Sequence, residues 1–252
     1  MILNEIISII EEKYPKILAY QWDNVGLLAG SGEKEIKKVL VTLDVTPDVV
    51  DEAINLGADL ILSHHPLIFD GIKSFEENSA KTNMYVKIIR NNLAVYSAHT
   101  NMDRAESGIN QRLSEILGLK NISVLEDETG LGRIGEVDET TLLEFTKMVK
   151  EKLSIKMVRV SGNLDAKISK VAVGSGACSD LYPLAIEKGT DVLITADLKY
   201  HTAIDSKSDG ISIIDAGHYP TEIIVMDMFE EILKNTNLEI YKSKMTDIFS
   251  YI

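Results

Sequence analysis

The chain has 252 residues, a formal net charge of −13 and one cysteine, Cys178. A hydrophobic content of 45% is enough for one large domain or two lobes with their own cores. The charge disfavours general binding to nucleic acid or anionic membranes. A lone cysteine excludes an internal disulfide framework, and no apolar run reaches the roughly 18 residues of a membrane span. We therefore expect a cytoplasmic protein.

The predicted elements alternate between helix and strand. In chain order they are a helix over 4–14, a strand over 37–45, a helix over 47–57, a buried strand over 59–63, a helix over 80–91, a strand over 93–99 and a helix over 108–119. Asn4 is a plausible cap and Pro15 a stop for the first helix, and Gly57 is a natural stop for the second. Strands joined by such crossovers predict a parallel sheet.

The middle of the chain, near residues 120–165, looks less regular. It holds a glycine-rich turn over 130–136, GLGRIGE, and an amphipathic helix over 140–153.

An internal repeat follows from sliding the chain along itself by 132 residues. Residues 38–63 then align with 170–195, with eight identities and no gap. The alternative, a general βαβ resemblance, would match hydrophobicity but less often the same glycine and aspartate. The repeat predicts a duplicated α/β fold with two similar, intertwined lobes, 1–125 and 126–252.

A second register, at a shift of 119 residues, aligns LAVYSAHTNMD with SIIDAGHYPTE. It sets His99 over His218 and Asp103 over Glu222. Each lobe therefore carries a strand followed by a histidine and, four residues later, a carboxylate, which would share one face of a helical turn. The alternatives are that Asp103 caps the following helix and that Glu222 complements a helix start.

All five histidines lie at or just beyond the C-terminal ends of predicted strands, where open parallel sheets bind ligands. They are His64, His65, His99, His201 and His218. Imidazole with carboxylate is a ligand set for zinc, iron, manganese and related ions. For the adjacent pair in SHHP, the alternative is one buried and one exposed histidine.

Taken together, these motifs predict one site between the two lobes. Two ions about 3.5–4 Å apart need bridging carboxylates and terminal imidazoles. Asp103 and Glu222 are the expected bridges, and the expected terminal ligands are His64, His65 and His218.

Other motifs leave two interpretations open. Trp22 either lines a pocket or anchors the core. Lys199 and His201 either act on a substrate or are a solvated lysine and a supporting histidine. GSGACSD lacks the spacing of a dinucleotide site, so Gly174 and Gly176 are expected to let the chain pass tightly.

In this order, the segments WDNVGL, SHHPLIF, SAHTNMD, GLGRIGE, TADLKYH and DAGHYPTE resemble the Nif-three-like family, also labelled GTP cyclohydrolase I type 2 homologues. The resemblance spans essentially the whole chain. It implies a dinuclear metal site on the same five ligands in the Nif-three-like fold, and a toroidal homohexamer of cytoplasmic subunits. His99 and His201 match further pocket positions of that family.

Two features depart from the family pattern. The stretch between GLGRIGE and KVAVGSG is too short for the domain inserted in some relatives. The commoner Thr-Gly-Glu or Thr-Gly-Asp turn is Thr195-Ala196-Asp197 here.

The expected function is a hydrolase that uses two divalent ions (Fe, Zn, Mn, Ni or Co) to activate water, with His99 or His201 moving protons. The family label implies a purine nucleotide, such as GTP, as substrate. The alternative is a ring-shaped metal-binding scaffold or regulatory protein that binds nucleic acid or a protein partner without catalysis.

Overall fold

The computed structural model describes residues 1–250 and residue 252. Among them the chain forms two compact units. Unit 1 comprises residues 1–102 and 225–246, and unit 2 comprises residues 103–224 with 247–252. Each unit is therefore made of two separate stretches of the chain. The two lobes expected from the repeat, 1–125 and 126–252, stay a prediction.

Unit 1 is built on a five-stranded sheet with the order β1-β4-β3-β2-β11. Its strands are β1 (Gly26–Ala29), β2 (Lys38–Thr42), β3 (Leu60–Ser63), β4 (Ala94–Ser97) and β11 (Glu239–Lys242). All pairs are parallel except β1 with β4. β3 and β4 are buried along their whole length, which explains why they lack the alternating pattern of a half-exposed strand.

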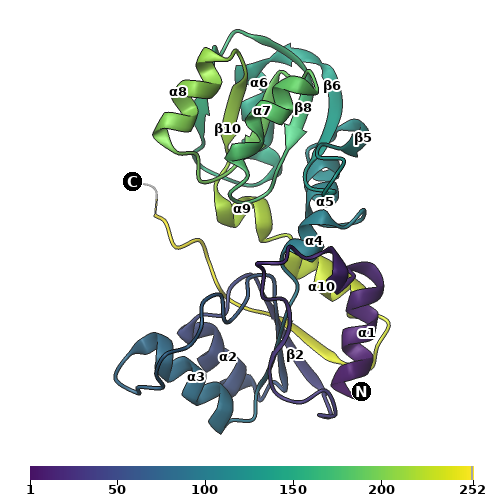
Figure 1. Cartoon of the computed structure of the whole chain (residues 1–252), viewed down its shortest axis with the longest axis vertical. Helices are drawn as coiled ribbons and strands as arrows, with labels where there is room; N and C mark the ends of the chain where they lie inside the picture. Colours follow the sequence, from purple (N-terminus) through teal and green to yellow (C-terminus); the bar gives the residue numbers. More distant parts are fainter. Residues whose placement is uncertain (251) are drawn as a thin grey trace. The chain divides into compact units, whose positions relative to one another are not determined.

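Helices cover both faces of this sheet. They are α1 (Leu3–Lys13), α2 (Pro47–Leu56), α3 (Ala80–Arg90) and α10 (Val225–Leu233), with a short 3-10 helix, η1 (Lys16–Leu18). Figure 1 shows α2 and α3 on one side of β2, and α1 with α10 on the other. Val50 of α2 and Ile88 of α3 pack with Leu40 and Ile61 of the sheet in one core cluster.

Unit 2 is built on a six-stranded sheet with the order β5-β6-β8-β9-β10-β7. Its strands are β5 (Lys120–Val124), β6 (Arg133–Thr141), β7 (Arg159–Ser161), β8 (Lys167–Val173), β9 (Val192–Thr195) and β10 (Ser212–Asp215). β8, β9 and β10 are parallel, and β7 joins β10 antiparallel. The region expected to be irregular, 120–165, therefore supplies three strands and a helix, because its strands complete both edges of this sheet.

Two helix layers pack on the unit 2 sheet. One includes α5 (Ile109–Ile116) and α6 (Leu142–Lys152), and the other includes α7 (Tyr182–Glu187) and α8 (Tyr200–Ser208). A 3-10 helix, η2 (Ser179–Leu181), leads into α7.

Two short helices each follow a parallel strand. α4 (Thr100–Arg104) follows β4, and α9 (His218–Glu222) follows β10.

The two sheets share a strand order. In each, three parallel strands lie side by side in chain order, and an antiparallel strand pairs with the third. Asp59 accepts hydrogen bonds from the backbone N–H groups of Lys37 and Lys38. In unit 2, Asp191 accepts the same two bonds from Ser169 and Lys170.

The expected Asn4 cap is wrong. The first helix begins at Leu3, so Asn4 lies inside it, and its side chain donates to Glu33 instead. The carboxylate of Glu5 accepts from the N–H of Ile2, which satisfies a donor at the start of the helix. Within the part of the chain that the structure describes, no helix is long and apolar enough to cross a membrane.

Candidate metal centre

Three histidines of unit 1 lie together just past β3 and β4. Ser63 and Ser97 are paired at the ends of these parallel strands, so the residues that follow emerge at the same level. One nitrogen each of His64, His65 and His99 lies within 4.8 Å of the other two. We call these three residues the imidazole cluster.

Each ring of the imidazole cluster is held through Nδ1 by an oxygen. His64 Nδ1 lies 2.8 Å from the carbonyl oxygen of Ala98, and His65 Nδ1 lies 2.7 Å from Oδ1 of Asp44. His99 Nδ1 lies 3.0 Å from Oδ1 of Asp23. These oxygens can only accept, so Nδ1 carries the proton and Nε2 bears the lone pair in the neutral ring. Metal-binding histidines are oriented in this way.

Asp23 is the most strongly perturbed carboxyl group of this cluster. Burial acts to raise its pKa, but hydrogen bonds from His99 and Thr100 outweigh burial and lower the pKa from 3.8 to about 2. Its side chain is fully buried. Asp23 therefore stays ionised across the physiological pH range and orients His99.

Trp22 does not anchor the core. Its side chain is 62% exposed, and its ring contacts the rings of Tyr20, Phe69 and His99. The interpretation of Trp22 as a core residue is thus wrong. Its position beside the imidazole cluster is compatible with the other interpretation, in which Trp22 lines a pocket.

Unit 2 contributes a histidine–carboxylate pair on α9. Nε2 of His218 lies 2.8 Å from Oε2 of Glu222, four residues later on the same helical face. Asp197 holds the other ring nitrogen, Nδ1, at 2.7 Å. The backbone of Asp197 is left-handed, with φ of 51°, a conformation that aspartate tolerates better than most residues. Glu222 is buried, with 4% of its surface exposed.

Gly176 packs directly against this pair. A Cβ at this position would lie 2.1 Å from Oε1 of Glu222 and 3.2 Å from Nε2 of His218. The N–H of Gly176 donates to Oγ1 of Thr221 on α9, and its φ is +59°. Only glycine fits here, as expected for the tight passage of GSGACSD.

Asp103 is fixed in the same unit by Asn110, whose side chain is fully buried. Asn110 Nδ2 donates to the carbonyl oxygen of Asp103, and Asn110 Oδ1 accepts from the N–H of Ser175. Burial, and with it the negative charges of Asp103, Glu222, Glu126 and Asp180, raises the pKa of the Cys178 thiol. The thiol therefore stays protonated and is a poor nucleophile.

His201 and Lys199 are placed differently from the other candidates. His201 is exposed in the first turn of α8, and its ring contacts the ring of Tyr200. Lys199 precedes this helix. Among the described residues, His201 belongs to no group of histidines, cysteines and carboxylates close enough to hold an ion. The catalytic role expected for His201 stays a prediction.

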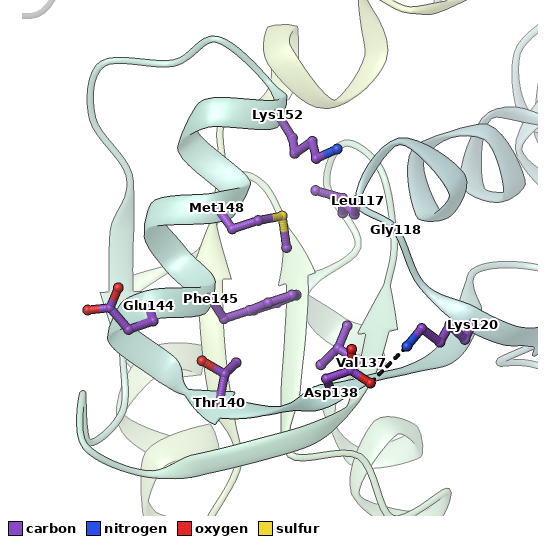
Figure 2. A pocket seen from close by; sticks show the side chains of 10 residues that line it. All are labelled: Leu117, Gly118, Lys120, Val137, Asp138, Thr140, Glu144, Phe145, Met148 and Lys152. Atoms are coloured by element: carbon purple, nitrogen blue, oxygen red, sulfur yellow. Dashed lines mark hydrogen bonds and ion pairs between the residues drawn. The ribbon is translucent and has the colours of Figure 1, made fainter.

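A separate cleft of about 290 Å³ opens on unit 2 between β5, β6 and α6. Figure 2 shows Phe145 and Met148 on one wall, and an ion pair between Lys120 and Asp138 at its edge. No histidine lines it. This cleft is therefore not the predicted site.

Sequence reasoning missed the three carboxylates that hold the rings, Asp23, Asp44 and Asp197. Asp23 and Asp197 belong to two of the motifs described above, WDNVGL and TADLKYH. The interpretation of those motifs rested on Trp22 and His201 instead. Asp44 is the last residue but one of the predicted strand 37–45 and belongs to no motif.

Comparison with known proteins gives close relatives over the whole chain. A "GTP cyclohydrolase 1 type 2 homolog" of Clostridium perfringens is 38% identical and covers 100% of both chains. One of Lactococcus lactis is 37% identical over 92% of this chain and 93% of its own. One of Halalkalibacterium halodurans aligns over 364 residues at 29% identity, so some relatives are longer.

Solved structures agree with the fold. A Bacillus cereus protein related to NIF3 superposes with a TM-score of 0.93 at 30% identity, over 100% of this chain and 99% of the other. Reduced HcgD from Methanocaldococcus jannaschii gives a TM-score of 0.86 at 34% identity, with 97% and 98% covered. The family model of Duf34/NIF3 (NGG1p interacting factor 3) matches residues 1–248. With its histidines at the strand ends of two α/β units, this chain belongs to the Duf34/NIF3 family.

Proposed function

We propose that the chain is a cytoplasmic hydrolase that uses two divalent cations, held jointly by the two units. The proposed terminal ligands are His64, His65 and His218, and the proposed bridges are Asp103 and Glu222. The donor set suits zinc, iron, manganese, nickel or cobalt alike. Unit 1 offers preoriented imidazoles, and unit 2 offers the imidazole of His218 beside the carboxylate of Glu222.

The observation that carries the proposal is the shared orientation of the rings. All three proposed histidine ligands bind an acceptor oxygen through Nδ1, which is a backbone carbonyl for His64 and a carboxylate for the other two. Histidines that served only for packing would have no common need for this arrangement. It turns Nε2 of each ring away from the supporting oxygen, and in His218 it turns Nε2 toward Glu222.

Held by these residues, a pair of divalent cations would lower the pKa of a bound water and so supply a nucleophile at neutral pH. The chain's own residues orient and move protons. Asp23 holds His99 in the tautomer whose Nε2 can accept a proton, and His99 lies beside the two ligands of unit 1. His201 is a second proposed proton carrier.

The proposed substrate is a purine nucleotide or a related small molecule. Its support is the name carried by the relatives from Clostridium and Lactococcus, which are called homologues of a GTP cyclohydrolase. A homohexameric ring is proposed on the family resemblance. Light scattering tests it, since a hexamer has about six times the 27.9 kDa of one chain.

A duplication is proposed as the origin of the two units. It is supported by the eight identities of the repeat and the shared strand order. It is further supported by the equivalent hydrogen bonds of Asp59 and Asp191.

The test is turnover of a panel of nucleotides and phosphoesters by metal-free protein reloaded with Mn²⁺, Fe²⁺ or Zn²⁺. We expect hydrolysis that needs the added ion and falls at least a hundredfold in His64→Ala and Glu222→Ala. Asp209→Asn, an exposed change on unit 2, is the matched control. Two bound ions per chain without turnover of any compound would instead support the scaffold function.

A further inference from the structure

Two exposed aromatic side chains of unit 1, Trp22 and Phe69, lie beside the half-buried Tyr20. Trp22 stacks on Tyr20, with ring centroids 5.6 Å apart and planes 13° apart, and lies 5.9 Å from the ring of Phe69. Trp22 is 62% exposed and Phe69 is 60% exposed. We call Tyr20, Trp22 and Phe69 the aromatic platform.

The platform adjoins the imidazole cluster through His99. The rings of Trp22 and Phe69 each lie 6.4 Å from the His99 ring, at interplanar angles of 75° and 76°. The ring centroid of His99 also lies 5.2 Å from that of His64 and 5.5 Å from that of His65. The His99 ring thus lies next to both the aromatic platform and the proposed metal ligands His64 and His65.

Hydrogen bonds hold the platform in place. The N–H of Tyr20 donates to Oγ1 of Thr100, and the N–H of Asp23 donates to the carbonyl oxygen of Tyr20. Asn24 Nδ2 donates to the carbonyl oxygen of Ile68 at 2.7 Å, which ties the Trp22 loop to the Phe69 loop. The buried carboxylate of Asp23 fastens the same loop to His99. Trp22 is therefore exposed on a fixed loop, and its surface is preorganised.

We propose that the aromatic platform binds a flat heteroaromatic ring of the substrate by stacking, with the edge of that ring turned toward His99. This inference rests on the proposed function and specifies its substrate class. Large exposed aromatic side chains gain most from a flat partner, because stacking covers apolar area without requiring fixed hydrogen bonds. A phosphate group offers no flat apolar face for such stacking.

Trp22 is the sole tryptophan, so its fluorescence reports directly on the platform. Guanosine and ribose 5-phosphate are titrated into the full-length protein, both metal-loaded and metal-free. We expect saturable quenching by guanosine in both forms and none by ribose 5-phosphate. By calorimetry, Trp22→Ala and Phe69→Ala should weaken guanosine binding about ten- to a hundredfold, and Trp22→Phe should retain most of it. Ile89→Ala, which alters a side chain 65% exposed on α3, should have no effect.

Quenching that does not saturate, or equal binding of ribose 5-phosphate, would overturn the inference. So would a Trp22 emission maximum that shifts to the blue with rising protein concentration, since another copy of the chain would then cover the ring. If guanosine binds but nothing is hydrolysed, the proposed function fails and the stacking site stands. If hydrolysis proceeds with unchanged KM in Trp22→Ala, the stacking site fails and the proposed function stands.

Discussion

Gly176 and Glu222 are in such close contact that a single added carbon at Gly176 would fall 2.1 Å from Oε1 of the carboxylate. The loop that follows β8 therefore packs directly against α9 within unit 2. The fit depends on the absence of a side chain, so it gives a sharp test of whether Glu222 is a ligand.

Gly176→Ala should displace the Glu222 carboxylate and reduce the divalent ions bound per chain. Gly189→Ala is the matched control, because its φ is +71° but no atom lies within 4 Å of the added carbon. Both variants should lose about 1–2 kcal/mol of unfolding free energy from left-handed strain. Elemental analysis should show metal loss in Gly176→Ala alone. Equal metal content in both variants would exclude Glu222 as a ligand.

Asp44→Ala should weaken metal binding about 10- to 100-fold, because the His65 ring would lose the carboxylate that fixes its Nδ1 proton. Asp51→Ala removes a carboxylate of the same unit that pairs with Lys87 and should leave the affinity unchanged. Titration of metal-free protein with Co²⁺ measures both. An unaltered affinity in Asp44→Ala would show that His65 is not a ligand.

The low pKa of Asp23 predicts an acid-dependent loss of stability. Burial raises this pKa, but the hydrogen bonds from His99 and Thr100 bring it from 3.8 to about 2, so the folded state favours the ionised form. The stabilisation is therefore complete above about pH 4 and is lost as the pH falls through about 2. Relative to Asp23→Asn, the natural chain should lose about 1–2 kcal/mol over this window. Urea unfolding at pH 2, 3, 4 and 5 measures the difference, and parallel curves for the two proteins would contradict the assignment.

Arg133 should be one of the most important side chains for the stability of unit 2. It is 2% exposed, and its guanidinium donates to Gln111 Oε1 and to the carbonyl oxygens of Gly130, Gly132, Ala105 and Glu106. Arg133→Met would leave these acceptors without their charged donor, and we expect a loss of about 3 kcal/mol or more. Arg90→Met, which breaks an exposed ion pair with Glu77, should cost under about 1 kcal/mol. Urea unfolding compares them, and similar losses would refute the role of Arg133.

Local sequence patterns predicted the α/β architecture and the positions of the histidines. The buried strands 60–63 and 94–97 appear as short apolar runs, and the helix expected over 80–91 is confirmed as Ala80–Arg90. The five histidines were expected at or just beyond strand ends, and His64 and His99 follow the neighbouring parallel strands β3 and β4, with ring centroids 5.2 Å apart. The shared site between the units and its five ligands stay proposals.

What the sequence determined by itself is therefore the alternation of helices and parallel strands between residues 37 and 119 and the residues at the ends of those strands, because periodicity and apolar runs encode burial locally. Only the tertiary structure decided which oxygen holds each imidazole, since Asp23 and His99 are 76 residues apart and meet through the paths of two loops. The exposure of Trp22 was decided in the same way, by hydrogen bonds that fix its loop against Thr100 and Ile68. Such contacts depend on distant segments, and no pattern of neighbouring residues specifies them.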